Sequence, residues 1–361
     1  ELFIGMRYLR ARRREVFISL ITLISVLGVT ISVITLDIAL SVTTGFERDL
    51  SDRILGFSPH VIVTTYGGPL GKPETLIEKL ATTPGVVAVA PYVYVQAMVS
   101  SQGKVTGVFL RGVEPAKATA VVDVAKYLKS GSFDELGKPH EVTVRNGGEE
   151  RKVSLSGVVV GVELAKQLGL VEGDPLTVVL PIGTPSAVGM VPKVKRFVVV
   201  GVFDSGMYEF DGAMIYVDIA EAQALVGLQD AVTGIEIRTE DVERAPEVAH
   251  RIESDVLGFP YEARDWMQMN RNVVIALRLQ KVVYFLVLSL MLLVAGFSIL
   301  ATLIMVVMEK RKDIAILKSM GATDASIAKI FVLKGLVIGL IGTVVGNAAG
   351  LGLSWLISKH K

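Results

Sequence analysis

The sequence predicts a membrane protein in which long transmembrane helices are combined with a large α+β domain inserted between the first and the second helix. Three uncharged apolar runs, 16–36, 282–308 and 335–358, are each long enough to cross a bilayer as a helix, for which ~20 residues suffice. The 361 residues are 51% hydrophobic and 20% charged, too apolar for an ordinary soluble protein and too charged for a helical bundle alone. A soluble domain is expected between the first two runs.

Basic residues set the expected orientation, because Lys and Arg accumulate on the cytoplasmic side of membrane spans. Five arginines precede the first run, and lysines and an arginine separate the second from the third. With both flanks inside, the inserted domain and the end of the chain at 359–361 lie outside. The first run exceeds a signal-peptide core and is followed by no small-residue cleavage site, so we interpret it as a retained span.

The chain divides at these runs. The predicted parts are 1–45, the cytoplasmic flank and first span; 46–280, the external domain; 281–308, the second span; 309–334, a cytoplasmic coupling segment; and 335–361, the third span. Within the external domain, strand–helix–strand patterns over 46–113 and 203–270 flank 114–202, which is predicted to be an inserted β subdomain. Three spans are visible, and we expect a fourth, which truncation of the sequence would remove.

The cytoplasmic segment 309–322 has the pattern of a short amphipathic helix. Ile314, Leu317 and Met320 recur at helical spacing, and Gly321 is suited to end the helix. A helix held at one membrane face between two spans is well placed to pass a push from a soluble partner into the bilayer. A plain charged loop is the alternative.

Small residues mark the third span. Asn347 needs a hydrogen-bond partner inside the protein. Glycines spaced by three or four residues allow another helix to approach closely, and this pattern predicts helix packing. The glycines are Gly335, Gly339, Gly342, Gly346 and Gly350.

The sequence shows no catalytic or metal-binding constellation. It has no cysteine, and its four histidines are scattered without zinc spacing. The glycine-rich stretch 67–73 places Pro73 where a phosphate loop needs Ser or Thr. We therefore predict a non-catalytic chain that binds no metal and no cofactor. A net charge of +1 also argues against nucleic acid as the main partner.

One loop of the external domain stands out. Residues 181–193 contain three prolines together with Val and Met, and they connect two predicted strands, 176–180 and 197–203. Apolar residues on a long tip indicate a partner surface. A merely flexible loop is the alternative.

Five stretches together carry a family resemblance that runs from end to end. The chain resembles the LolC/LolE family, the permease subunits of the lipoprotein-releasing ABC transporter of Gram-negative bacteria. The stretches are FIGMRYLRAR at 3–12, GFER at 45–48, DSGMYEFD at 204–211, Asp265-Trp266 with Asn270, and EKRKDIAILKSMGA at 309–322.

The resemblance implies an inner-membrane permease of the MacB-like class with four spans and a large periplasmic domain. Two copies or homologues would bind a cytoplasmic ABC ATPase dimer, which would carry the ATP and Mg²⁺. ATP-driven closure would squeeze a triacylated lipoprotein from between the first two spans, next to membrane lipids, and pass it to a soluble periplasmic carrier. Whether the permease pairs with itself or with a homologue stays open.

The resemblance also implies residue roles. Docking on the ATPase would fall to Glu309, Lys310, Arg311, Asp313, Ile314, Ile316, Leu317, Met320 and Gly321. The acyl-chain cavity would be lined by Ile34, Ile38, Val42, Phe46, Tyr284, Phe285 and Leu288. The carrier-binding hook would contain Pro185, Val188, Met190, Val191 and Pro192. Thr43 and Thr44 depart from the Met-Asn that is common in the family.

Two other functions fit the same architecture. A MacB-type exporter of small molecules or peptides would normally carry a fused ATPase domain, which this sequence lacks. An FtsX-like permease would transmit ATPase motion without moving cargo, and the well-developed middle region with its hook favours transport over that function.

Overall fold

A computed structural model describes residues 16–146, 149–186 and 189–359 of the chain. The arginines that precede the first span and Val188 of the predicted hook lie outside the described residues. The chain forms two compact units, one from Glu1–Asp49 with Val273–Lys361 and the other from Leu50–Asn272. We call them the membrane unit and the α+β unit.

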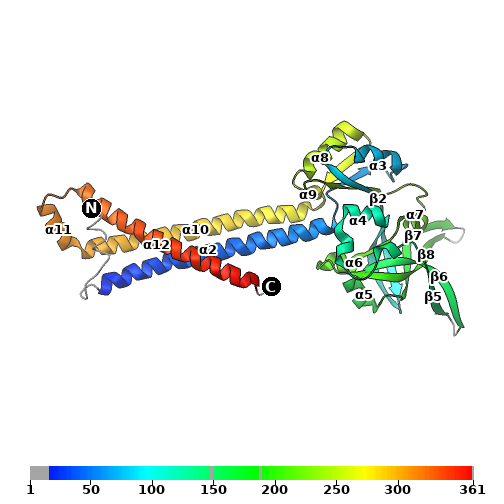
Figure 1. The fold of residues 1–361 in the computed structure, drawn as a ribbon, viewed down its shortest axis with the longest axis horizontal. Helices are drawn as coiled ribbons and strands as arrows, with labels where there is room; N and C mark the ends of the chain where they lie inside the picture. Colours follow the sequence, from blue (N-terminus) through cyan, green and yellow to red (C-terminus); the bar gives the residue numbers. More distant parts are fainter. Residues whose placement is uncertain (1–15, 147–148, 187–188, 360–361) are drawn as a thin grey trace. The chain divides into compact units, whose positions relative to one another are not determined.

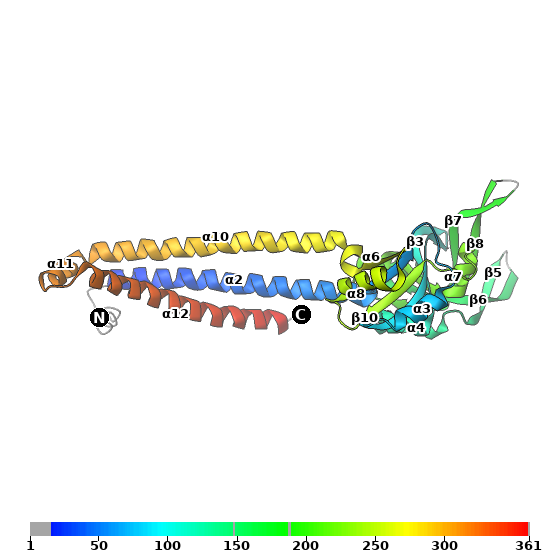
Figure 2. The same cartoon turned by 90° about the horizontal axis from the view of Figure 1, so that it is seen from above.

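Long apolar helices build the membrane unit, as predicted. They are α2 (Val16–Phe57), α10 (Arg271–Glu309) and α12 (Asp324–Lys359), with the short α11 (Arg311–Ser319) between the last two. Their candidate spans have mean hydropathies of 2.3, 2.7 and 2.0. In both views α10 runs alongside α2 (Figures 1 and 2). The absence of charge over each run explains this outcome, because a helix satisfies its own backbone groups in lipid.

The glycines of α12 bring this helix close to α2. A Cβ atom placed on Gly342 would lie 2.8 Å from Val29, one on Gly346 would lie 2.7 Å from Val33, and one on Gly350 would lie 2.7 Å from Asp37. The hydroxyl of Thr30 donates to the Gly342 carbonyl at 3.3 Å. The α2–α12 contact is therefore close because these glycines have no side chains.

Polar side chains add hydrogen bonds and an ion pair between the helices of this unit. With its amide nitrogen oriented toward α2, Asn347 donates to the Asp37 carboxylate at 2.9 Å. The hydroxyls of Ser25 on α2 and Thr302 on α10 share a hydrogen bond of 2.5 Å. Each pair satisfies polar groups that would be costly if they faced lipid alone. Glu47 and Lys281 form an ion pair at 3.1 Å between α2 and α10.

Within the described residues, eleven strands form one sheet in the α+β unit. Its order is β11-β1-β10-β2-β3-β9-β6-β8-β4, with β5 on β6 and with β7 paired to both β2 and β8. The strands are β1 (Val61–Thr65), β2 (Val86–Ser101), β3 (Lys104–Val113), β4 (Leu128–Gly131), β5 (Pro139–Asn146), β6 (Glu149–Gly161), β7 (Pro175–Ser186), β8 (Gly189–Phe203), β9 (Met214–Asp218), β10 (Gly234–Thr239) and β11 (Tyr261–Asp265).

Short helices connect and cover these strands (Figure 1). They are α3 (Pro73–Ala81), α4 (Pro115–Val121), α5 (Val162–Leu168), α6 (Tyr208–Ala213), α7 (Ile219–Val226), α8 (Ala245–Arg251) and α9 (Trp266–Met269), with the helical turns η1 (Asp123–Tyr127), η2 (Phe133–Glu135) and η3 (Ile252–Leu257). The membrane-helical plus α+β fold class is thus confirmed.

The two strand–helix–strand segments interleave. Strand β1 pairs antiparallel with both β10 and β11, and β10 in turn pairs with β2, so strands from the two ends of the domain alternate. Strands from the middle of the domain extend the same sheet, because β6 pairs with β9 and β7 pairs with β2. One sheet therefore joins the segments that the sequence patterns separate.

A buried ion pair lies beside the aromatic part of the core. Arg111 on β3 bonds to Glu236 on β10, with 6% and 3% of their side chains exposed. Burial raises the pKa of the Glu236 carboxyl, and the guanidinium opposes that rise. Arg111 also donates to the Phe57 carbonyl at 3.4 Å, at the last residue of α2. The cost of removing both charges from water offsets their attraction, so a buried pair of this kind adds little net stability.

The glycine contact predicts the effect of a larger side chain on α12. Gly346→Leu should push α12 away from Val33 and lower the thermal unfolding midpoint of the detergent-solubilised protein, since overpacking costs about 1–3 kcal/mol. Gly352→Leu on the same helix is the matched control, because a Cβ there meets nothing within 4 Å. Equal midpoints for the two variants would refute the close contact.

Candidate functional site

The coupling segment folds as the short helix α11. Lys310 pairs with Asp313 at 3.2 Å near its start, and Lys318 pairs with Asp324 of α12 at 2.5 Å near its end. Gly321 has φ +94°, and its amide donates to the Lys318 carbonyl at 3.0 Å. The helix therefore ends at Ser319, and the predicted glycine supplies the tight turn that leads into α12.

The apolar residues of α11 divide between two faces. Ile314 and Leu317 are half-buried, whereas Ile316 and Met320, one turn apart, are 58% and 78% exposed. Large exposed apolar side chains one turn apart form a surface that a groove on another protein can receive. The geometry thus gives α11 one face toward its own chain and one free of it.

An apolar groove of about 510 Å³ lies among the three long helices of the membrane unit. Thr343, Ser289 and Ser32 are its polar side chains, and the rest of its wall is aliphatic, aromatic or glycine. The lining residues are Val29, Ser32, Val33, Leu36, Phe285, Leu288, Ser289, Met291, Leu292, Ala295, Gly296, Ile299, Gly339 and Thr343. Such a wall can hold an alkyl chain through contact area.

The predicted cavity residues are placed in two groups. Phe285 and Leu288, on α10, line the groove. The four predicted residues of α2 are not among its lining: Ile34 and Ile38 are half-buried, and Val42 and Phe46 are exposed. Tyr284 is half-buried, and its hydroxyl accepts a hydrogen bond from Gln280 at 3.5 Å.

The residues of α2 that line the groove differ from those to which the resemblance points. Val29, Ser32 and Leu36 lie on the helix face opposite to Ile34, Ile38 and Val42, as their spacing at 100° per residue requires. A signal for this face was present in the sequence. Ser25, Gly28 and Ser32 recur at spacings of three and four, and small residues mark helix faces that pack against protein in membranes.

The predicted hook is a hairpin of β7 and β8. Among the described residues, β7 pairs with both β2 and β8 up to Val179, and beyond that point with β8 alone. The ladder continues to Pro185 opposite Met190 and Ser186 opposite Gly189. Pro192 is exposed, and Val191 is 45% exposed. The tip is therefore a two-stranded extension from the sheet, longer in strand than the sequence indicated.

Two family models match the chain over its two kinds of structure. A model of the MacB-like periplasmic core domain matches residues 22–255, and one of the FtsX-like permease C-terminal region matches residues 285–361. The first match covers more than half of the chain, and the second covers most of α10, α11 and α12.

Curated relatives match along almost the entire chain. The lipoprotein-releasing system transmembrane protein LolC of Neisseria meningitidis is 32% identical over 99% of this chain and 83% of its own length. LolC of Xylella fastidiosa is 33% identical over 99% and 82%, and LolE of Haemophilus influenzae is 26% identical over 99% and 85%. With this identity along its length, the chain belongs to the LolC/LolE family of lipoprotein-releasing system transmembrane proteins.

Proposed function

We propose that this chain is the permease subunit of an ABC transporter that extracts lipoproteins from the outer leaflet of the inner membrane and hands them to a periplasmic carrier. The observation that carries the proposal is the apolar groove among α2, α10 and α12 in a chain of this family. An acyl chain in such a groove is held by buried area, at ~25 cal/mol per Å². No directional bond then opposes its release.

In this proposal, the ATPase drives the transporter through its contact with α11. A cytoplasmic ABC ATPase dimer holds the ATP and Mg²⁺, and this chain binds neither. The exposed pair Ile316 and Met320 supports a docking role, because it offers an apolar contact to a groove on that ATPase. The ion pairs of Lys310 and Lys318 brace the helix, so a push on α11 is passed on to α12.

Cargo leaves through the α+β unit, which is periplasmic in this orientation. The β7–β8 hairpin supports a carrier-binding role, because it extends from the sheet with Val191 exposed. A second permease, either a copy of this chain or a homologue, completes the transporter. The triacylated form of the lipoprotein is the cargo that the resemblance implies.

Reconstitution tests the whole proposal. The full-length permease and its ATPase are placed in liposomes with a triacylated lipoprotein, and ATP-dependent appearance of that lipoprotein on soluble carrier is measured. Transfer is expected with ATP and absent without it. Transfer with this permease alone would indicate a homodimer, and transfer only after a homologue is added would indicate a heterodimer. ATP hydrolysis without transfer in both cases would refute the proposed cargo and favour export of other substrates or signalling.

A charge on the exposed face of α11 should uncouple the transporter. Met320→Asp is expected to leave folding intact and to lower ATP-driven transfer at least tenfold, since burying an unpaired carboxylate at an interface is costly. Ala315→Asp places the same charge on an exposed position away from Ile316 and Met320, and should transfer normally. Normal transfer by Met320→Asp would remove the docking role from this face.

Removing the hairpin tip should separate hydrolysis from delivery. Deletion of residues 183–191 takes away paired ends of β7 and β8 and leaves the part of β7 that pairs with β2. ATPase activity is expected to stay at the wild-type level, whereas lipoprotein recovered on the carrier should fall to background. Unimpaired delivery by the shortened hairpin would exclude it as the carrier-binding site.

A further inference from the structure

The last two turns of α2 belong to the core of the α+β unit. Residues 50–57 fall in that unit, and Ile54 and Phe57 are 4% and 0% exposed. The Phe57 ring lies 4.7 Å from that of Tyr127 and 5.8 Å from those of Phe203 and Phe210. The helix end is thus packed among aromatic side chains.

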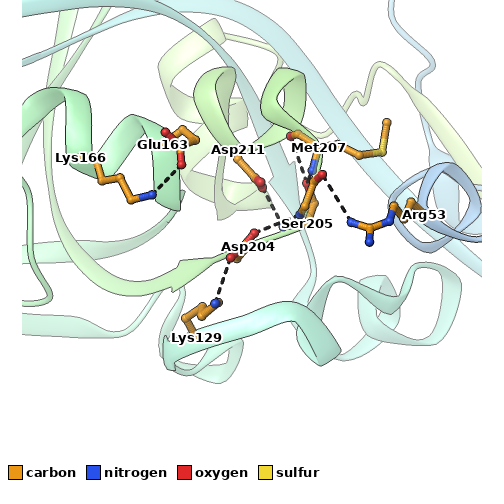
Figure 3. Close-up of polar contacts among 9 residues, drawn as sticks. Arg53, Lys129, Glu163, Lys166, Asp204, Ser205, Met207 and Asp211 are labelled. Carbon is orange, nitrogen blue, oxygen red and sulfur yellow. Dashed lines mark hydrogen bonds and ion pairs between the residues drawn. The ribbon is translucent and has the colours of Figure 1, made fainter. Parts of the chain in front are cut away.

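One face of this helix end meets the segment 204–211, a motif to which the proposed function gives no role. The backbone of the segment is held by its own side chains. The Gly206 amide donates to Asp204 at 3.0 Å, the Met207 amide donates to the Ser205 hydroxyl at 3.0 Å, and the Ser205 amide donates to Asp211 at 2.7 Å. Figure 3 shows these contacts. The segment is therefore a preformed turn.

Charges anchor the turn to the rest of the unit. Lys129 on β4 pairs with Asp204 at 3.0 Å. The Lys129 ammonium, together with the Gly206 amide, holds the pKa of Asp204 below its usual range. Asp211 is 97% buried, since 3% of it is exposed. The ionised Asp204 carboxylate thus anchors the turn to β4.

Gly206 is the point at which the turn touches α2. Its carbonyl accepts a hydrogen bond from the Arg53 guanidinium at 3.4 Å (Figure 3). It has φ +70°, and a Cβ at this position would lie 2.0 Å from an Arg53 nitrogen. The positive φ therefore favours glycine at this position, and a Cβ here would require the end of the flexible Arg53 side chain to move. Gly103, with φ +80°, has nothing within 4 Å of such a Cβ.

We propose that the segment 204–211 is a clasp that fixes the end of the first membrane helix to the periplasmic domain, with Arg53 and Gly206 as positioning residues. The clasp rests on the proposed function, because it delivers movement of α2 during the ATPase cycle to the domain that hands over the cargo. Phe57 packs the end of the helix among aromatic rings, and the hydrogen bond from Arg53 to Gly206 holds this end against the turn.

Hydrogen exchange of the full permease–ATPase complex in lipid nanodiscs tests the clasp without cargo or carrier. Amide exchange in α6 and β8 is compared between the nucleotide-free complex and the complex trapped with ATP and vanadate. In the wild type we expect nucleotide to change these exchange rates by about twofold or more. In Arg53→Ala and Gly206→Ala the change should disappear, while ATP hydrolysis continues.

Three further variants separate positioning from folding. Arg53→Lys keeps a cationic donor and should restore at least part of the nucleotide response. Gly103→Ala carries a comparable backbone strain in open space, and Lys117→Ala removes an exposed cation that pairs with Glu114 and not with the turn, so both should respond like the wild type. Thermal unfolding of each variant is recorded, and Arg53→Ala decides the test if Gly206→Ala does not fold.

Two results would overturn the clasp: a wild-type complex whose α6 and β8 do not respond to nucleotide, or an Arg53→Ala complex that responds fully. The transfer assay is read separately. A wild type that responds to nucleotide in exchange but delivers no lipoprotein would refute the proposed cargo and leave the clasp standing.

Discussion

The continuity of α2 is the constraint on which the rest of this structure depends. The helix runs unbroken from Val16 to Phe57, yet its residues up to Asp49 belong to the membrane unit and the remainder to the α+β unit. Its two parts face opposite chemical demands. The first must present apolar side chains and satisfy Asp37 through Asn347, whereas the second must fill an aromatic core with Phe57 and let Arg53 reach a turn. One continuous helix meets both demands.

In the membrane unit, α2 packs closely against α12, whereas a groove adjoins its contact with α10. Toward α12 the contact is close, because three glycines face Val29, Val33 and Asp37. Toward α10, the Ser25–Thr302 and Glu47–Lys281 contacts are separated along α2 by 22 residues, counted from Ser25 to Glu47. The apolar groove lies along the stretch between them. The volume available to an alkyl chain therefore lies, among the described residues, between two polar contacts of α2 with α10.

Much of this architecture follows from the sequence alone. An uncharged run in lipid must satisfy its backbone hydrogen bonds within itself, as a helix does. The three uncharged runs therefore directly predict α2, α10 and α12. Local spacing left α11 open between a short helix and a charged loop, and the family resemblance favoured the helix, with Gly321 expected to follow its end. The interleaving of β1 between β10 and β11 was not predictable, because it pairs residues about 170–200 positions apart and no local pattern encodes such pairs.

The face of α2 that lines the groove was missed for a related reason. Every face of a membrane helix is apolar, so hydrophobic periodicity cannot tell lipid contact from protein contact. Ile34 and Ile38 were selected through the resemblance and not through residue size. Small residues such as Ser25, Gly28 and Ser32 allow helices to approach, and the bulkier Val29 and Leu36 line the groove beside them. In this fold, size is the better guide to an internal membrane surface than hydrophobicity, since lipid exerts no hydrophobic preference between one apolar face and another.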